Sequence, residues 1–330
     1  MPEEADAANP PAVTAVIPTR RRPHLLRRAL ASVAAQTFED LEAVVVVDGP
    51  DDETMALLDR WRERPLRVVV NDPPVGGGQA RNIGVQTARG RWVALLDDDD
   101  EWLPRKLERQ VSDLERLGSD RVVGITQLIT RSPTADYVGR DGGPRDDEPV
   151  SEYLFVRSGW VQAGGRAHTS TLLAPRDLFL EIPFDPALPR YQDTDWVLRV
   201  AAAGVRLHMT PEPLSIWYVE EARPGVTRSH AGDWRYALGW IRARRHLMTE
   251  RAYISLVVMR VGGLAAAAWD PRGAIAAVRE ARRVGRPRLR DIALVIGKFA
   301  LPPGLRRRLR ARIAGRQPIA PGSAVEGVEE

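Results

Sequence analysis

The 330-residue chain has no cysteine and only two lysines, Lys106 and Lys298. The absence of cysteine excludes disulfide bonds, thiolate metal sites and a cysteine nucleophile. The scarcity of lysine means that nearly all the positive charge is arginine. With 44% hydrophobic and 28% charged residues, the composition is that of a globular protein. The length allows one large domain or two of ordinary size.

No targeting or membrane-spanning segment is evident either. The N-terminus, Met-Pro-Glu-Glu-Ala-Asp, is acidic and lacks the basic and apolar regions of a signal peptide, so a cytoplasmic location is expected. Residues 252–269 form the most apolar stretch, but they include Arg260 and two central glycines. This composition favours a buried or interfacial helix over a bilayer span.

The net charge of +4 is unevenly distributed. Residues 1–278 carry 35 basic and 39 acidic residues, a net −4, whereas residues 279–330 carry 13 and 5, a net +8. Within residues 305–313, leucine or isoleucine recurs every fourth position among arginines, which predicts a short basic amphipathic helix. Two interpretations stay open for it: binding to an anionic surface at the inner face of the cytoplasmic membrane, or packing on the rest of the chain with solvated arginines.

Short β-branched runs alternate with amphipathic segments in the first part of the chain. Strands are predicted at residues 13–17, 41–47, 66–70, 92–96 and 121–129, with helices at 23–35, 53–63, 78–88 and 103–117. In the second part, strands are predicted near 169–173, 205–209 and 214–218, with a helix near 194–203. This alternation predicts an α/β fold with a mostly parallel sheet and helices on both faces.

Five parts of the chain are distinguished by these patterns. They are a flexible N-terminus 1–11, a first half 12–130 and a second half 131–232 of one α/β domain, a helical basic extension 233–316, and a flexible tail 317–330.

Five consecutive carboxylates, from Asp97 to Glu101, follow a predicted buried strand. Ligands of open α/β sheets bind beyond the carboxyl ends of the strands, and a hard divalent cation would relieve the repulsion among adjacent acids. The other interpretation is a solvated acidic turn that caps the following helix. A second acidic turn, which begins at Asp48, would lie at the same edge of the sheet.

The loop of residues 75–82 combines three glycines with Arg81. Glycine lets the backbone come close to a ligand, and a guanidinium can hold a phosphate through two hydrogen bonds. The chain has neither the G-x-G-x-x-G nor the G-x-x-x-x-G-K-[ST] pattern, so it lacks the usual dinucleotide and P-loop signatures.

Together these motifs resemble the family 2 glycosyltransferases of the GT-A fold over about residues 13–218. The resemblance is carried by Val16-Ile17-Pro18-Thr19-Arg20, Gln36-Thr37-Phe38, Val46-Val47-Asp48-Gly49, Ala80-Arg81-Asn82-Ile83-Gly84, Gly90-Arg91-Trp92-Val93 and the segment from Leu96 to Lys106. It implies an inverting enzyme that transfers a sugar from a nucleoside diphosphate sugar, with a UDP-sugar favoured. The acceptor would be a hydroxyl of a saccharide, a lipid-linked glycan or a secondary metabolite. Residues 12–130 would then bind the nucleotide sugar, and residues 131–232 the acceptor.

The resemblance also implies roles for individual residues. The positions that match nucleotide contacts are Pro18, Thr19, Arg20, Asp48, Arg81, Asp97 and Asp98, with Asp48 accepting a hydrogen bond from the base. Asp97 and Asp99 match the ends of the family's D-x-D motif, and Asp99 is the better candidate for direct ligation of Mn²⁺ or Mg²⁺. Since the run is four aspartates long, a shift of one residue in the ligand assignment stays open. His230, ranked above His168, is a further candidate for contact with the metal or the acceptor.

The segment Tyr191-Gln192-Asp193-Thr194-Asp195-Trp196 matches the place where the family usually has Glu-Asp, the Asp acting as general base on the acceptor hydroxyl. Gln192 replaces the Glu here, Asp193 is the matched base, and Asp195 is the alternative. A carboxylate base opposite the leaving group gives inversion. The competing interpretation is that Asp193 only caps the following helix.

Two other functions fit the sequence less well. A sugar-phosphate nucleotidyltransferase shares the architecture, but residues 18–23 contain arginines without the glycines of its activating loop. A nucleic-acid-binding protein would use the arginine-rich C-terminal segment, but that segment lacks interleaved aromatic residues and the carboxylate clusters would be unexplained. We therefore expect no nucleic-acid partner.

Overall fold

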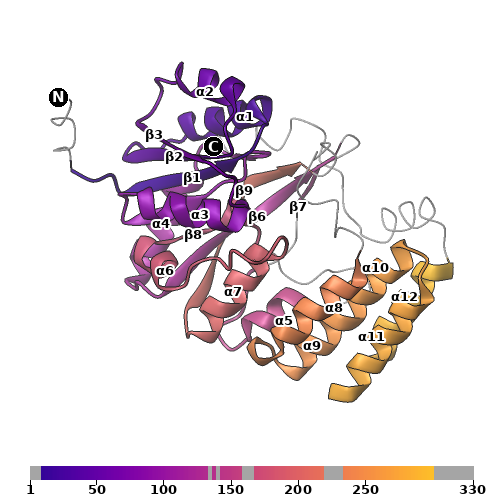
Figure 1. The fold of residues 1–330 in the computed structure, drawn as a ribbon. Coiled ribbons are helices and arrows are strands. Elements are labelled where there is room, and N and C mark those ends of the chain that lie inside the picture. Colours follow the sequence, from indigo (N-terminus) through magenta and orange to yellow (C-terminus); the bar gives the residue numbers. More distant parts are fainter. Residues whose placement is uncertain (1–8, 133–135, 139–141, 158–166, 219–232, 301–330) are drawn as a thin grey trace. The chain divides into compact units, whose positions relative to one another are not determined.

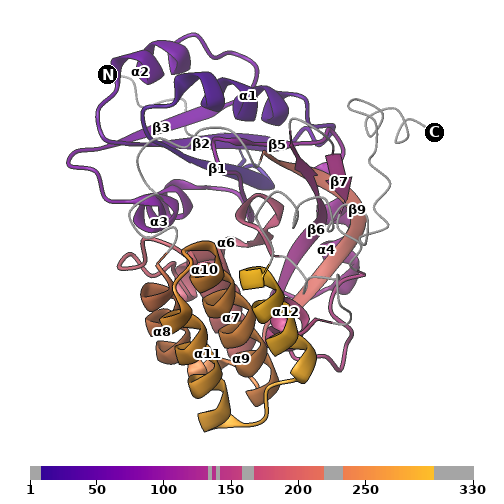
Figure 2. The ribbon, with the colours of Figure 1, turned by 90° about the vertical axis from the view of Figure 1, so that its right-hand side faces the viewer.

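The computed structural model describes residues 9–132, 136–138, 142–157, 167–218 and 233–300 (Figure 1). The chain divides into two compact units, each considered by itself: residues 1–142 with 167–221, and residues 143–166 with 222–330. The first unit is α/β and the second is helical (Figure 2). The second unit includes residues 143–166, a segment that the sequence patterns assign to the second half of the α/β domain.

The first unit is built on a nine-stranded sheet of order β3-β2-β1-β4-β8-β6-β9-β5, with β7 paired to β6. The strands are β1 (Val13–Thr19), β2 (Leu41–Asp48), β3 (Leu66–Asn71), β4 (Trp92–Leu95), β5 (Asp100–Trp102), β6 (Val122–Arg131), β7 (Asp136–Val138), β8 (Leu173–Pro175) and β9 (Arg206–Tyr218). Strands β1 to β4 are parallel, whereas β8, β5 and β7 run antiparallel to their neighbours. The sheet is therefore parallel on one side and mixed on the other.

Helices cover this sheet because its central strands are buried throughout. The helices of the unit are α1 (Pro23–Ala34), α2 (Asp52–Leu58), α3 (Gly77–Thr87), α4 (Lys106–Leu117), α6 (Arg176–Glu181) and α7 (Gln192–Ala202), with a 3-10 turn η1 (Thr169–Thr171). Every residue of β1 and β2 is buried, which requires cover on both faces. A Cβ atom on Gly84 of α3 would lie 2.3 Å from Val16 Cγ1, so only glycine allows α3 to pack this closely.

The strands and helices predicted in residues 12–129 are confirmed apart from their ends, although the helix predicted at 53–63 already ends at Leu58. The strand predicted near 169–173 is wrong, since residues 169–171 form the turn η1 and the strand β8 begins only at Leu173. The two strands predicted at 205–209 and 214–218 are one strand, β9, which pairs with β6 across a register shift after Thr126. The shift accommodates Pro211 and Pro213, which a regular ladder tolerates poorly. The helix predicted from residue 103 begins at Lys106, because the acidic run leads into the strand β5.

The second unit is a helical bundle (Figure 2). Its elements are α5 (Val150–Phe155), α8 (Trp234–Ala243), the 3-10 turn η2 (Arg245–Leu247), α9 (Glu250–Leu256), the π-helical turn η3 (Val257–Val261), α10 (Gly262–Ala267), α11 (Pro271–Val284) and α12 (Leu289–Ala300). The apolar stretch 252–269 forms α9, η3 and α10 and is largely buried, as predicted. Among the described residues, no helix combines the length and apolar character needed to cross a membrane. The segment 305–313 and His230 lie outside the described residues.

One of the two lysines is a buried amine in the first unit. Lys106 is 0% exposed, and its Nζ lies 4.1 Å from the ring centroid of Trp102 without a hydrogen-bond partner among the described residues. Burial lowers the pKa of Lys106 well below its ordinary value of 10.5. An unfolded chain therefore binds a proton that the folded chain releases, and the free energy of unfolding should rise with pH between the lowered pKa and 10.5.

Replacing Lys106 by Met should remove this pH dependence. Methionine fills a similar volume against Trp102 and has no charge to desolvate. The variant should have a higher free energy of unfolding than the wild type at neutral pH. This difference in the free energy of unfolding should become smaller as the pH rises toward the ordinary lysine pKa. Urea unfolding from neutral to mildly alkaline pH measures both effects, and parallel curves for the two proteins would contradict the assignment.

Candidate active site

The candidate site lies where neighbouring strands of the sheet end. Strands β2, β1 and β4 are adjacent and parallel, so Asp48 at the end of β2, Thr19 at the end of β1 and the acidic run after β4 meet at one edge. This is the arrangement that the sequence predicts. Pro18 and Thr19 are buried there, whereas Arg20 is exposed.

The acidic run is buried, and its interpretation as a solvated turn is wrong. Asp98, Asp99 and Asp100 are 1%, 5% and 0% exposed, and only Asp97 and Glu101 keep partial exposure. The reason is the strand β5, in which Asp100 pairs with Trp217 of β9. This pairing holds the end of the acidic run in the sheet, where the carboxylates of Asp98, Asp99 and Asp100 are buried.

Arginine and a hydroxyl group balance the buried acids. Arg22, just before α1, places Nη2 2.6 Å from Asp98 Oδ1 and Nη1 3.3 Å from Asp99 Oδ2. Thr19 Oγ1 donates a hydrogen bond of 2.7 Å to Asp98 Oδ2. Burial raises the pKa of Asp98 to about 7 and neighbouring Asp99 adds to this, although Arg22 opposes it. Near neutral pH the run therefore carries less negative charge than its residue types indicate.

Arg81 links three elements of the site. Its Nη2 donates a 2.5 Å hydrogen bond to Asp97 Oδ1, and its Nη1 donates a 2.7 Å bond to Gln192 Oε1 at the start of α7. Burial alone would lower the pKa of Arg81, but the carboxylates of Asp97, Asp193 and Asp98 raise it above its ordinary value. Gln192, which departs from the family pattern, thus accepts a hydrogen bond from Arg81, and the same guanidinium also donates to Asp97 of the acidic run.

Asp48 shapes the glycine loop. Its carboxylate oxygens accept hydrogen bonds of 2.7 Å from the Val75 N–H and 3.0 Å from the Gly76 N–H. Gly76 has φ +87°, a conformation that side chains rarely adopt, and it precedes α3. The Asp48 side chain is buried, so in this structure it positions the loop that presents Arg81.

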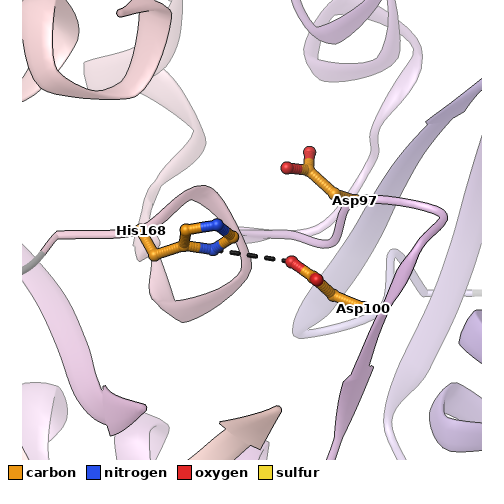
Figure 3. A group of neighbouring side chains, drawn as sticks. All are labelled: Asp97, Asp100 and His168. Atoms are coloured by element: carbon orange, nitrogen blue, oxygen red, sulfur yellow. Dashed lines mark ion pairs between the residues drawn. The ribbon is translucent and has the colours of Figure 1, made fainter. Parts of the chain in front are cut away.

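Asp97, Asp100 and His168 form a group that could hold a metal ion (Figure 3). Each offers one ligand atom, and these atoms all lie within 4.8 Å of one another. His168 Nδ1 lies 3.5 Å from Asp100 Oδ2. Two carboxylates and an imidazole are donors that Mn²⁺ accepts, and the spacing fits atoms placed around one ion.

Ser170 organises the same group. Its Oγ donates a 2.5 Å bond to Asp100 Oδ2 and accepts a 3.1 Å bond from the Asp97 N–H. Its N–H donates to His168 Nδ1 at 3.4 Å. The 3-10 turn η1 therefore holds all three residues of the group in place.

The two candidate bases differ sharply in environment. Asp193 is the second residue of α7, is partly exposed and accepts a 2.7 Å bond from the Thr194 N–H. The N-cap of α7 is Tyr191, with φ +64°, so Asp193 is not the helix cap that the competing interpretation supposed. Asp195 is 0% exposed and pairs with Arg199 at 2.8 Å inside the same helix. Of these two aspartates, only Asp193 contributes to the raised pKa of Arg81.

The structure thus gathers Thr19, Arg81 and the acidic run as predicted, and adds residues that the sequence patterns missed. Those added are Arg22, Asp100 and Ser170. His168 lies beside them, and the preferred His230 lies outside the described residues. Asp99, preferred as the metal ligand, instead faces Arg22. The usable signal for Arg22 was its place between a strand end and a proline-started helix.

Comparisons with known proteins agree with this geometry. Residues 14–159 match the model of "Glycosyl transferase family 2". The chain is 29% identical over 248 residues to the amylovoran biosynthesis glycosyltransferase AmsB of Erwinia amylovora, covering 72% of this chain and 78% of AmsB. It is 31% identical over 120 residues to WfgD of Escherichia coli, named as a UDP-Glc:α-D-GlcNAc-diphosphoundecaprenol β-1,3-glucosyltransferase, covering 36% of this chain and 47% of WfgD.

A solved structure shares the fold. The mannosyltransferase PcManGT from Pyrobaculum calidifontis, in complex with GDP-Man and Mn²⁺, matches with a TM-score of 0.54 and 20% identity, over 93% of this chain and 87% of that one. The solved structure shows the GT-A fold, and with the match over residues 14–159 and the named relatives it supports a family 2 glycosyltransferase.

Proposed function

We propose that the chain is a metal-dependent, inverting glycosyltransferase that moves a sugar from a nucleoside diphosphate donor, favouring UDP, to a hydroxyl of a saccharide or lipid-linked acceptor. The observation that carries the proposal is the arrangement around Arg81. Its guanidinium donates a hydrogen bond to Asp97 of the acidic run, and the negative charge of Asp193 helps to raise its pKa. A cation for phosphate, carboxylates for a metal and a carboxylate base thus lie at one sheet edge.

On the donor side, Arg81 and the glycine loop would bind the diphosphate. Glycines at positions 76 to 78 leave the backbone accessible, and a Cβ atom on Gly77 would come within 3.3 Å of Arg81 Nη1. Asp97, Asp100 and His168 would hold Mn²⁺ or Mg²⁺. When bound, the ion neutralises the charge of the departing diphosphate. Thr19 and Arg22 keep the acidic run in its buried position.

On the acceptor side, Asp193 would take the proton from the attacking hydroxyl. A general base must reach the proton that it removes, and Asp193 has the exposure for this while buried Asp195 does not. Attack from the face opposite the leaving diphosphate inverts the anomeric configuration. The names of AmsB and WfgD support an acceptor in a bacterial glycan, and the name of WfgD supports a UDP-sugar donor.

A thermal-shift panel of UDP, GDP, dTDP and CDP, each with and without Mn²⁺, tests the proposal. One nucleotide should raise the melting temperature, and Mn²⁺ should increase that shift, since Asp97, Asp100 and His168 would hold the ion and its charge would favour binding of the diphosphate. AMP with Mn²⁺ is the control, because it lacks the diphosphate. If none of the four stabilised the protein in a metal-dependent way, the proposal would be rejected.

A further inference from the structure

The second unit has a surface that is apolar and cationic at once. Of the eight large hydrophobic residues that are exposed among those described, the four most exposed lie in this unit. They are Trp269, Ile275, Leu289 and Ile296, at 58%, 50%, 84% and 62%. They belong to α11, α12 and the three residues that join α10 to α11, and both α11 and α12 pack on α10 and η3.

Helix α12 exposes apolar residues and buries its acidic one. Its exposed residues Leu289, Ala293 and Ile296 are spaced as one helix face and are all apolar. Its acid, Asp291, is 3% exposed, and Arg290 turns inward to donate to the Arg157 carbonyl. A helix facing water normally shows the opposite pattern, so this face needs an apolar partner.

Helix α11 supplies arginines beside this face. Arg272, Arg279 and Arg282 are exposed at the spacing of one helix face, and Arg286 follows the helix. Glu280, the acidic residue of α11, is 8% exposed and pairs with Arg242 and Arg283, so it does not balance the others. Residues 233–300 carry 14 basic and 5 acidic residues, a net +9.

Aromatic residues complete the surface. Trp269 lies edge-on to Phe299 of α12, with ring centroids 6.5 Å apart, and is still 58% exposed. Tryptophan is favoured where a protein meets the boundary between lipid headgroups and acyl chains. We define the α11–α12 surface as the apolar residues Trp269, Ile275, Leu289, Ala293 and Ile296 with the arginines 272, 279, 282 and 286.

We propose that the α11–α12 surface docks on an anionic phospholipid bilayer. Apolar side chains would enter the headgroup region while the arginines contact lipid phosphates, as in amphipathic helices that lie on membranes. At 12 residues, α12 is too short to cross a bilayer. A second copy of the chain is a poorer occupant, because its arginines would face the arginines of this surface. The same repulsion disfavours residues 301–330, which contain six arginines. The proposal does not depend on the donor or the metal.

Sedimentation of the full-length protein with vesicles tests it. Binding should be strong to phosphatidylcholine mixed with phosphatidylglycerol, weak to phosphatidylcholine alone, and reduced by salt. The double variant Leu289→Ser with Ile296→Ser should bind at least about tenfold more weakly. The triple variant Arg279→Gln, Arg282→Gln and Arg286→Gln should lose roughly a hundredfold at low salt.

Matched controls place the same changes on exposed residues of the first unit. Leu180 is 40% exposed, and the Arg116 side chain is 74% exposed. The variants Leu180→Ser and Arg116→Gln should bind vesicles like the wild type. Unchanged melting temperatures would show that all variants fold.

The proposal is overturned if the wild type does not sediment, if the α11–α12 variants bind normally, or if only a variant with Arg306, Arg307 and Arg308 changed to Gln loses binding. Concentration-dependent dimers that the Leu289/Ile296 variant lacks would assign the surface to a second copy instead.

Discussion

Asp193→Asn should lower the turnover number for sugar transfer by about 10²- to 10⁴-fold, the usual contribution of a positioned general base. Asparagine keeps the shape of the side chain and can still accept the hydrogen bond that Asp193 receives from the Thr194 N–H. It cannot take up a proton. The fold and the affinity for the nucleotide should therefore be unchanged, while release of nucleoside diphosphate in the presence of acceptor falls.

The matched control for this variant is Asp195→Asn, two residues further along α7. Asp195 is buried and holds Arg199 at 2.8 Å, so its replacement leaves a cation without its carboxylate and should lower the melting temperature. Residual activity at a temperature where both variants are folded should be much higher for Asp195→Asn. A fully active Asp193→Asn enzyme would move the base elsewhere and reject this part of the proposed mechanism.

The sequence predicts the sheet edge well because local patterns determine it. Continuous apolar runs such as Ala43 to Val47 require a strand that is covered on both faces, and the polar residues after each run must then meet at one edge. The Asp48 turn and the acidic run are placed together on this basis, whereas Arg81 is added by the family resemblance. No contact between distant segments had to be known.

The burial of the acidic run could not be predicted in this way. It depends on the pairing of Asp100 in β5 with Trp217 in β9, which lie far apart in the chain. A run of carboxylates on its own is compatible with a metal site or with a solvated turn. Its burial is possible because Arg22, Thr19 and Ser170 supply hydrogen bonds from three other segments.

The ranking of the two histidines stays a prediction, because His230 lies outside the described residues. The sequence favours His230 because of its place in the stretch 227–230, which is expected to be flexible. In the structure the turn η1 brings His168 next to Asp100, and the Ser170 backbone fixes its ring. The family resemblance likewise selects Asp99 from four adjacent aspartates, whereas the described contacts direct Asp99 toward Arg22.

Replacing His168 by Ala should weaken Mn²⁺ binding at least about tenfold, measured by titration of the nucleotide-bound protein while free Mn²⁺ is followed by electron paramagnetic resonance. Asp97→Asn and Asp100→Asn should act in the same direction, since these three residues offer ligand atoms within 4.8 Å of one another. Asp99→Asn is the decisive comparison, because it removes a neighbouring carboxylate that pairs with Arg22 at 3.3 Å without disturbing the three-residue group.

The pattern across the four variants distinguishes two metal sites. If Asp100 and His168 are ligands, their variants lose Mn²⁺ affinity and Asp99→Asn keeps most of it. If the ends of the D-x-D motif are the ligands, Asp97→Asn and Asp99→Asn lose affinity and His168→Ala binds normally. Because the titration measures the ion itself, a variant that binds Mn²⁺ normally but transfers no sugar still counts against its residue as a ligand. Loss of affinity in His168→Ala with retention in Asp99→Asn is the result that the geometry of Figure 3 leads us to expect.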